Sequence, residues 1–464
     1  MAVRTLSGPG LAARAAALER PVVSLGGAVL ALSLPLIFLH ADHQPGFTLH
    51  AGSTGVSVYL SDLAMLAVGL AALLAGFRWG FRPLRDGLSI WIAGTALLAM
   101  VFLATFYPLL SDRSYDWHRH IVTAGKFAEY GVLALALPLL LRRGRELWVL
   151  LAALVAWSTV ATTVGIAQFF GWSVAEAWAP GRRQPSFVGH HDFAALSCAA
   201  LAAGLAALAV PSWRVNRALA ATGVVSGVLG LIASGSAAAA AGLVAAAIAV
   251  ALVAWRRRSL DARRLTAVVL VAAVGAGGVA VLRGGDLDQF VRFLGVRRAE
   301  PTTSQNVQTY VQHTLLAYIG LKVFLGHPAV GVGWQGSGEE SGYGPYLGAA
   351  HRKFPHASPL SFPSPAHPWG VQNGWVQALA DLGIVGFLLL VWLFASGLVV
   401  AGRRALRGPP ELAGPAVVAG VWLLCAMGIL SAVGLVAGIP LDALMWLGLG
   451  LAATAAAGTL RAAA

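Results

Sequence analysis

Charged side chains and cysteines are scarce in this chain of 464 residues. Asp, Glu, Lys and Arg together make up 11% of it, whereas 58% of its residues are hydrophobic. This composition excludes an ordinary soluble enzyme and is typical of a protein that crosses a membrane many times. The two cysteines, Cys198 and Cys425, both fall within apolar runs, so they support neither a disulfide framework nor a thiolate metal site.

Apolar runs long enough to cross about 30 Å of hydrocarbon recur along the whole chain. They are residues 22–39, 57–77, 87–110, 119–141, 147–168, 193–210, 219–235, 237–255, 265–282, 382–402, 414–435 and 441–459. The seventh and eighth runs are separated only by the turn signal of Ser234, Gly235 and Ser236. We therefore expect an all-α polytopic membrane protein with about 12 transmembrane helices.

The connections between these runs carry basic residues on alternate sides. If residues 1–21 form a cytoplasmic tail, most of the 32 Lys and Arg residues lie on the cytoplasmic side, as the positive-inside rule requires. The net charge of +13 is thus explained by topology and gives no indication of nucleic-acid binding. The predicted order is helices 1–9 within 22–282, an extracytoplasmic loop over 283–373 and helices 10–12 within 374–464. Both termini are then cytoplasmic and the protein spans the plasma (inner) membrane.

The same topology places all 12 histidines on the outer side or at the outer end of a span. In the long outer loop, the apolar residues that begin at Val307 recur with helical period and predict an amphipathic helix. Gly331, Gly333 and Gly336 match G-x-G-x-x-G, but no strand precedes them in a βαβ unit, so we do not expect a nucleotide site.

A second outer cluster lies in AWAPGRRQPSFVGHHDFAALS, residues 177–197. Arg182 and Arg183 either lie at the membrane interface with no specific ligand or clamp a diphosphate. Adjacent His190 and His191 cannot easily direct both rings at one metal ion, so no metal site is expected. Asp192 is suited to cap the helix that follows.

The last outer segment ends in HPWGVQNGWVQALADLGIVGFLLL, residues 367–390. In a helix, Asn373, Gln377 and Asp381 lie on one face. With Gln372 they would offer hydrogen-bonding groups to a hydroxyl-rich ligand. Within the spans, Lys126 and Glu129 either pair with each other or form the polar wall of a cavity.

Three stretches resemble the O-antigen ligase/polymerase family of membrane glycan transferases. They are RRQPSFVGHHDFAAL, FLGHPAVGVG and QNGWVQALADLGIVGFLLL. The resemblance implies a glycosyltransferase that works without cofactor or metal. Its donor would be a glycan linked to a polyprenyl diphosphate in the lipid bilayer, and its acceptor the hydroxyl of a glycan, lipid or protein.

The resemblance also implies roles for individual residues. Arg183, with Arg182 as a partner, would hold the diphosphate, and a histidine would assist the acceptor. The family's His-Asn pair is Gln372-Asn373 here, so His367 is the candidate that remains for the histidine. His190, His191, Gln377 and Asp381 would complete the substrate-binding set.

One family arginine is missing from its usual place. The common Ser-Arg-Gly segment reads Ser236-Ala237 in this chain, and the residues that could replace the arginine are Arg283, Arg292, Arg297 and Arg298. A polytopic transporter or flippase for a glycolipid or polysaccharide precursor is the alternative function, although the two halves show no self-similarity of the kind that carriers often have. A non-catalytic scaffold would leave the outer His and Arg residues unexplained.

Overall fold

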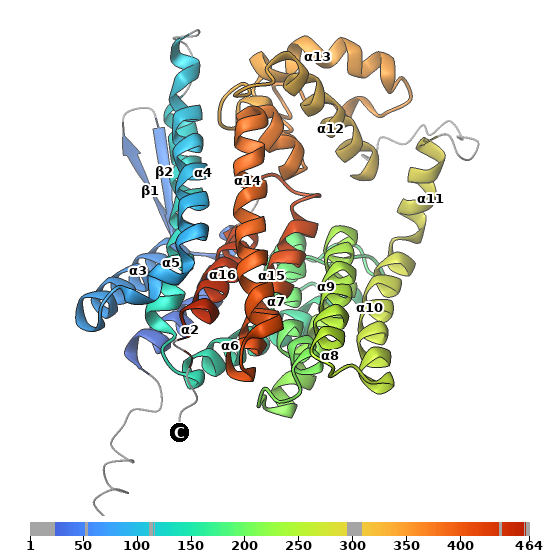
Figure 1. The fold of residues 1–464 in the computed structure, drawn as a ribbon. Helices are drawn as coiled ribbons and strands as arrows, with labels where there is room; N and C mark the ends of the chain where they lie inside the picture. The colour runs from blue at the N-terminus through green and yellow to red at the C-terminus, as the bar shows by residue number, and fades with distance from the viewer. Residues whose placement is uncertain are drawn as a thin grey trace, which may run out of the picture.

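The computed structural model describes residues 24–51, 54–110, 115, 117–294, 309–435, 439–458 and 460. The predicted tail, 1–21, lies outside the described residues. The described chain forms a bundle of helices with a smaller group of helices over one end (Figure 1).

Each of the 12 predicted runs overlaps a helix. These helices are α2 (Leu25–Ile37), α3 (Leu60–Trp79), α4 (Leu88–Phe106), α5 (Trp117–Leu140), α6 (Gly144–Phe169), α7 (His190–Ala209), α8 (Arg217–Ser234), α9 (Ala237–Arg256), α10 (Ala262–Leu282), α14 (Gly374–Arg407), α15 (Pro410–Ile429) and α16 (Ile439–Ala457). Among the described residues, 10 helices are long and apolar enough to cross a membrane, whereas Leu25–Ile37 and Asp442–Ala457 are shorter apolar helices. The chain is therefore a multi-pass membrane protein.

A β-hairpin precedes α3 and was not expected in an all-α fold. Strands β1 (Gly46–Ala51) and β2 (Thr54–Tyr59) pair antiparallel, with Phe47 opposite Val58. The run predicted to begin at residue 57 therefore starts as a strand, and the helix begins only at Leu60. Asp62 fixes that start, because its Oδ2 accepts a hydrogen bond from the Tyr59 backbone N–H at 2.8 Å.

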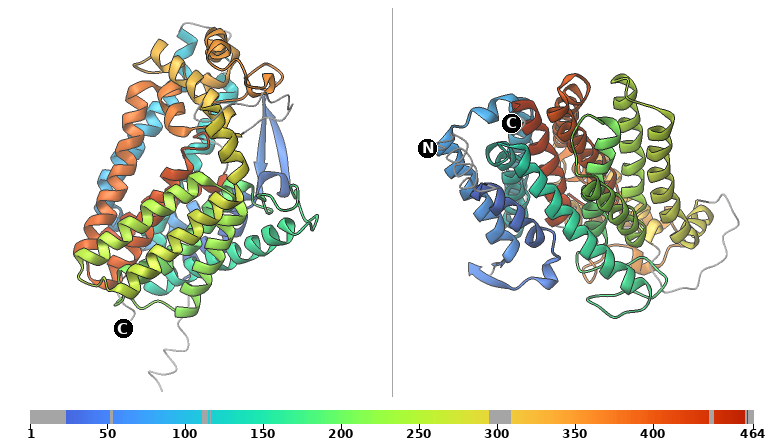
Figure 2. Two further views of the ribbon diagram at one scale, coloured as in Figure 1. Left: turned by 90° about the vertical axis from the view of Figure 1, so that its right-hand side faces the viewer. Right: turned by 90° about the horizontal axis from the view of Figure 1, so that it is seen from below.

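Three further helices, α11 (Gly284–Phe293), α12 (Thr309–Gly326) and α13 (Glu340–Lys353), lie at one end of the bundle, which we call the capped end (Figures 1 and 2). The described part of the predicted amphipathic helix is α12. Its buried residues recur every three or four positions, from Gln312 to Val323. The apolar ones, Leu315, Leu316, Ile319 and Val323, pack with Tyr343 of α13 and Ala380 of α14. Val307, where the pattern begins, lies outside the described residues.

Burial differs strongly between the helices that cross the bundle. The hydrophobic window of α7 is 89% buried, whereas that of α10 is 17% buried. α7 packs against α8 and α15 through small residues, as membrane helices commonly do. α10 packs on α9 and α8 and leaves most of its surface open to the lipid.

Short turns and 3₁₀ segments complete the described chain. They are η1 (Ala41–His43), η2 (Arg82–Gly87), η3 (Tyr107–Leu110), η4 (Gly336–Gly338) and η5 (Pro359–Ser361). At Gly383, α14 leaves helical geometry, with φ 66° and ψ −166°. The chain before η4 packs into this break, where the Ile384 N–H donates to the Pro328 carbonyl at 2.9 Å.

Candidate functional site

Two arginines from distant parts of the chain meet beside the turn that joins α8 and α9. Arg183 lies between α6 and α7, and Arg283 directly follows α10. Gly235 forms the turn, and its carbonyl accepts a hydrogen bond from Arg283 Nη1 at 3.4 Å. A Cβ atom on Gly235 would lie 2.7 Å from Arg183 Cβ and 3.4 Å from Arg283 Cδ. With its φ of 62°, glycine is the residue that allows both arginines to approach this turn.

Arg183 is held by partners that carry no negative charge. Its Nη1 lies 3.0 Å from His190 Nε2, and its Nη2 donates to Thr309 Oγ1 at 3.3 Å. The guanidinium lies over the Trp178 ring, 4.8 Å from the ring centre. Burial and the nearby charge of Arg283 lower the pKa of Arg183 to about 10. The guanidinium therefore keeps its proton at neutral pH.

Arg283 is more deeply buried, with 4% of its surface exposed. Its Nε lies 2.6 Å from Asp286 Oδ2, and its guanidinium lies 4.8 Å from the centre of the Tyr310 ring. One carboxylate is thus paired within a group that holds two guanidinium ions. The excess positive charge suits an anionic ligand with several oxygens.

Three histidines lie beside the two arginines. His190 and His191 open α7, and their ring centres are 3.7 Å apart. His313 lies one helical turn after Thr309 on α12, so both side chains face the same way. Burial and the charges of Arg183 and Arg283 lower the pKa of His313 to about 4, which leaves its imidazole neutral at pH 7. We refer to these three histidines and the two arginines as the arginine site.

Some polar atoms around this site have no protein partner. Among the described residues, His191 Nδ1, Tyr310 Oη and Gln312 Nε2 are buried without a hydrogen bond. Such atoms are rare in native proteins and point to a ligand or water. Among all the residues that the structure describes, no group of three or more His, Cys, Asp or Glu side chains could hold a metal ion.

An apolar cavity of about 200 Å³ lies between α9 and α10 and has Arg283 in its wall. Alanines from both helices line it, among them Ala240 and Ala276. Since α10 is mostly open to lipid, the cavity lies where a hydrocarbon chain could enter it from the bilayer. The cavity therefore has an apolar lining in which the Arg283 side chain is the one charged group that the structure describes.

Two other predicted site residues, Arg182 and His367, lie in surroundings that differ from those of Arg183. Arg182, next to Arg183, has an exposed side chain. His367 lies in an irregular segment, where its backbone N–H donates to the Ser364 carbonyl at 3.0 Å and its ring stacks on Trp369 with 5.9 Å between centres. The structure brings Arg183, His190 and His191 together and records no contact from His367 to them.

Gln372 and Asn373 lie just before α14. Gln372 is half-buried, and Asn373 caps the helix, since its Oδ1 accepts from the Val376 N–H at 3.1 Å. Gly320 of α12 packs close to Val376. Thr309, which contacts Arg183, and Gly320, which lies close to Val376, are separated by about 16 Å along the axis of α12. α12 therefore links the arginine site to the Gln372–Asn373 segment.

Gln377 and Asp381 point into the protein and are buried. Gln377 Nε2 donates to Asp381 Oδ2 at 2.9 Å. The Asp381 carboxylate also accepts from the backbone N–H groups of Gln335 at 3.2 Å and Ser337 at 2.9 Å. Asp381 thereby fastens the glycine-rich segment around η4 to α14. Gly331, the first glycine of the G-x-G-x-x-G match, serves this packing, because a Cβ on it would collide with the Asp381 backbone.

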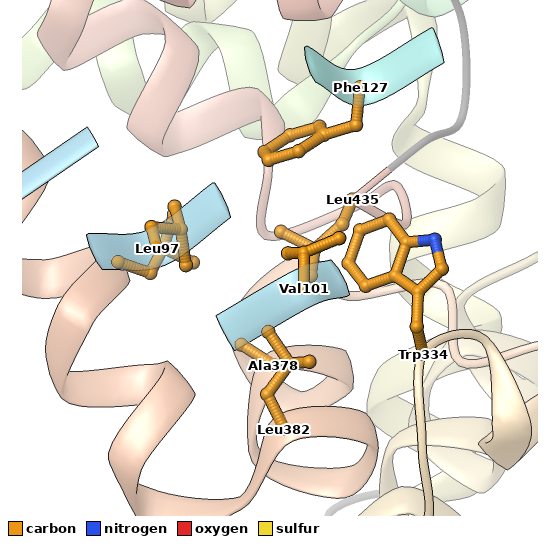
Figure 3. Close-up of a pocket in the computed structure, with 8 residues that line it drawn as sticks. Leu97, Val101, Phe127, Trp334, Ala378, Leu382 and Leu435 are labelled. Carbon is orange, nitrogen blue, oxygen red and sulfur yellow. The ribbon is translucent and has the colours of Figure 1, made fainter. Parts of the chain in front are cut away.

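A tightly packed apolar pocket lies beneath this segment (Figure 3). Trp334 enters it beside Val101, Phe127 and Ala378, with Leu97, Leu382, Leu390 and Leu435 completing the lining. The indole Nε1–H is satisfied by Thr123 Oγ1 at 3.0 Å. The pocket anchors the segment and offers no polar group to a glycan.

The charged residues of the predicted spans form a small network. Lys126 pairs with Asp62 of α3 as well as with Glu129, whose Oε2 lies 3.7 Å from Lys126 Nζ. The i, i+3 pair, one of the two alternatives for these residues, is therefore present, and a second carboxylate from another helix joins it.

Comparison with known protein families identifies the centre of the chain. Residues 221–391 match the model of the family described as O-Antigen ligase. The chain carries an O-antigen ligase domain. The family predicted from three short motifs is thereby confirmed, and two of those motifs, at 324–333 and 372–390, lie within the matched residues. No curated protein matches the chain.

The O-antigen ligase domain runs from α8 into α14 and contributes Arg283 and His313 to the arginine site. Arg183, His190 and His191 come from the chain before it. From the sequence alone, Arg283 is one of four possible replacements and His313 has no expected role. No sequence motif marks Thr309, Tyr310 and Trp178, which contact the two arginines.

Proposed function

We propose that the protein is a glycosyltransferase of the O-antigen ligase/polymerase type that uses a polyprenyl-diphosphate-linked glycan. It would transfer the glycan to an acceptor hydroxyl at the outer face of the plasma membrane. The observation that carries this proposal is that Arg283, which lies beside Arg183 at the Gly235 turn, also forms part of the wall of the apolar cavity between α9 and α10. A ligand that fits both parts has an anionic head and a hydrocarbon tail.

The two guanidinium groups would bind the diphosphate. When the acceptor oxygen forms its bond to the anomeric carbon, the bond from that carbon to the phosphate oxygen breaks. The electron pair leaves with the polyprenyl diphosphate, and the fixed charges of Arg183 and Arg283 stabilise the growing negative charge. The outer environment lacks nucleotide sugars and ATP, so a donor that is already activated is required.

Arg283 would replace the arginine that the family commonly has after Ser236. It reaches the same turn from the end of α10, through its hydrogen bond to Gly235. Arg292 is engaged elsewhere, with its Nε 2.8 Å from Asp288 Oδ2. Arg297 and Arg298 lie outside the described residues.

The remaining predicted residues have places in the same proposal. Arg182, His190 and His191 would border the donor head, and the Gln372–Asn373 segment would contact the glycan farther along α12. Gln377 and Asp381 would support that contact from beneath, through the segment that Asp381 fastens. His367 is the histidine that the resemblance proposes for the acceptor.

The test is the release of polyprenyl diphosphate by the purified protein in liposomes that contain lipid-diphosphate-linked glycans and mixed acceptors. Arg183→Ala and Arg283→Ala should each lower acceptor-dependent release by about 100-fold or more, because each removes a charge that stabilises the transition state. Arg292→Ala is the matched control, since it removes an arginine of α11 that is paired outside the site. Its release should stay near the wild-type rate.

Two results would count against the proposal. Equal losses in all three variants would show that the cluster has no specific role. Movement of intact glycolipid across the bilayer, without release of polyprenyl diphosphate, would favour the transporter or flippase instead.

A further inference from the structure

The first two turns of α12 present several polar groups to the arginine site. Thr309 Oγ1 accepts from Arg183, and Tyr310 lies under the Arg283 guanidinium. Tyr310 Oη and Gln312 Nε2 are buried and have no partner among the described residues. Because helical residues three and four apart are neighbours, Thr309, Gln312 and His313 lie close together on one side of this helix.

The three histidines of the site are not equally free to accept a proton. His190 Nε2 faces Arg183 Nη1 at 3.0 Å, so its lone pair is engaged by the guanidinium. His191 packs its ring against that of His190, so its unpartnered Nδ1 is assigned with His190 to the donor head. His313 is on α12, which lies over the end of the bundle (Figure 1), on the side that an acceptor from outside the membrane would reach.

We propose that His313 accepts the proton of the acceptor hydroxyl and that Tyr310 and Gln312 hydrogen-bond the same acceptor. This inference rests on the proposed function and adds an acceptor subsite to it. The sequence places Gln372 where the family has a histidine, and His313 supplies an imidazole from another helix.

The transfer step balances with these groups. The acceptor O–H bond breaks and its proton moves to a ring nitrogen of His313, while the acceptor oxygen bonds to the anomeric carbon of the donor. The bond from that carbon to the diphosphate breaks, and the electron pair departs with the polyprenyl diphosphate held by Arg183 and Arg283. His313 then returns the proton to water.

The electrostatic setting keeps the His313 imidazole neutral, so that its ring nitrogen is available as a proton acceptor. Burial and the two guanidinium charges lower the pKa of His313 to about 4. The other ionisable groups of the cluster are His190, His191, Asp286 and Tyr310. The imidazole is therefore neutral between pH 5 and pH 8, whereas an ordinary histidine with a pKa near 6.5 would be about 97% protonated at pH 5.

The experiment compares His313→Gln, His367→Gln and His327→Gln in the liposome assay, with binding of unglycosylated polyprenyl diphosphate measured in parallel. His327 is the matched control, because it is an exposed histidine just beyond the other end of α12. His313→Gln should lower the transfer rate by about 100-fold or more and leave diphosphate binding within about twofold. The wild-type rate should hold from pH 8 to pH 5 and fall as the pH decreases through about 4.

Each other outcome has a distinct meaning. Transfer that survives His313→Gln but is lost with His367→Gln would overturn this inference and leave the proposed function standing. A wild-type rate that falls by about 30-fold between pH 8 and pH 5, as for a base of pKa 6.5, would overturn it as well. If wild-type protein binds no polyprenyl diphosphate and transfers nothing, the proposed function fails and the inference fails with it.

Discussion

At the scale of single residues, Gly235 decides how closely two cations approach each other. Its backbone lies in the left-handed region. A Cβ atom added to Gly235 would lie only 2.7 Å from Arg183 Cβ, so the absence of a side chain leaves room for Arg183. Asp286 pairs with Arg283 and offsets part of the repulsion between the two arginines, and the proposed diphosphate would offset the rest. Small changes in backbone geometry here should therefore affect ligand binding more than folding.

The Gly235→Ala variant tests this role. Alanine costs about 1 kcal/mol in a left-handed conformation, and its methyl group must displace Arg183. Glycan transfer should fall by about 10- to 100-fold, since small misplacements of charged groups cost that much. Gly420→Ala in α15 is the control, because no atom lies within 4 Å of the added Cβ. Equal activity of the two variants would contradict the role given to Gly235.

At the scale of elements, the Asp381 carboxylate and backbone hydrogen bonds, such as that from the Val332 N–H to the Ala380 carbonyl at 3.0 Å, hold the segment around η4 to α14. Asp381 accepts hydrogen bonds from Gln377, Gln335 and Ser337, and Gly383 opens the helix so that the chain from Pro328 can pack into the break. A glycine-rich stretch thereby becomes a fixed support under α13 and the Gln372–Asn373 segment. Asp381 acts on the site through this support.

Replacing Asp381 with alanine should therefore destabilise the protein. The change leaves buried N–H groups without an acceptor, at a cost of about 3 kcal/mol, and the melting temperature in detergent should fall by several degrees. Asp288→Ala is the control, because its pair with Arg292 is partly exposed and such pairs contribute about 0–1 kcal/mol. If Asp381→Ala instead keeps the wild-type melting temperature and abolishes transfer, the carboxylate acts directly on the substrate.

The sequence predicts elements better than it predicts contacts between them. Apolar length alone located a helix at each expected span, because the bilayer sets that length. It missed the hairpin at 46–59, since strands that short and exposed leave little trace beside long apolar runs. It also could not choose Arg283, because that choice depends on how the end of α10 meets the α8–α9 turn, a contact 48 residues apart in the chain.

At the scale of the whole molecule, the basic connections gather at the end opposite α12 and α13. Arg257 of the α9–α10 connection donates to the Ala405 carbonyl at 2.9 Å and to the Gly408 carbonyl at 3.0 Å, at the end of α14. Arg142, after α5, donates to the Gly80 carbonyl after α3 at 3.5 Å. By the positive-inside rule, we expect this end to be cytoplasmic. The arginine site would then lie at the outer end of the bundle.

Cysteine labelling tests this orientation. Arg352→Cys in α13 and Arg403→Cys in α14 place thiols at exposed positions on opposite ends, and the native Cys198 and Cys425 are buried, so background labelling should be low. In spheroplasts, a membrane-impermeant maleimide should label Arg352→Cys directly and Arg403→Cys only after permeabilisation. The reverse pattern would place the arginine site in the cytoplasm, where nucleotide-activated sugars are present. The argument for a donor already activated on a lipid diphosphate would then fail, and the excess positive charge of the site would have to be explained by another anion.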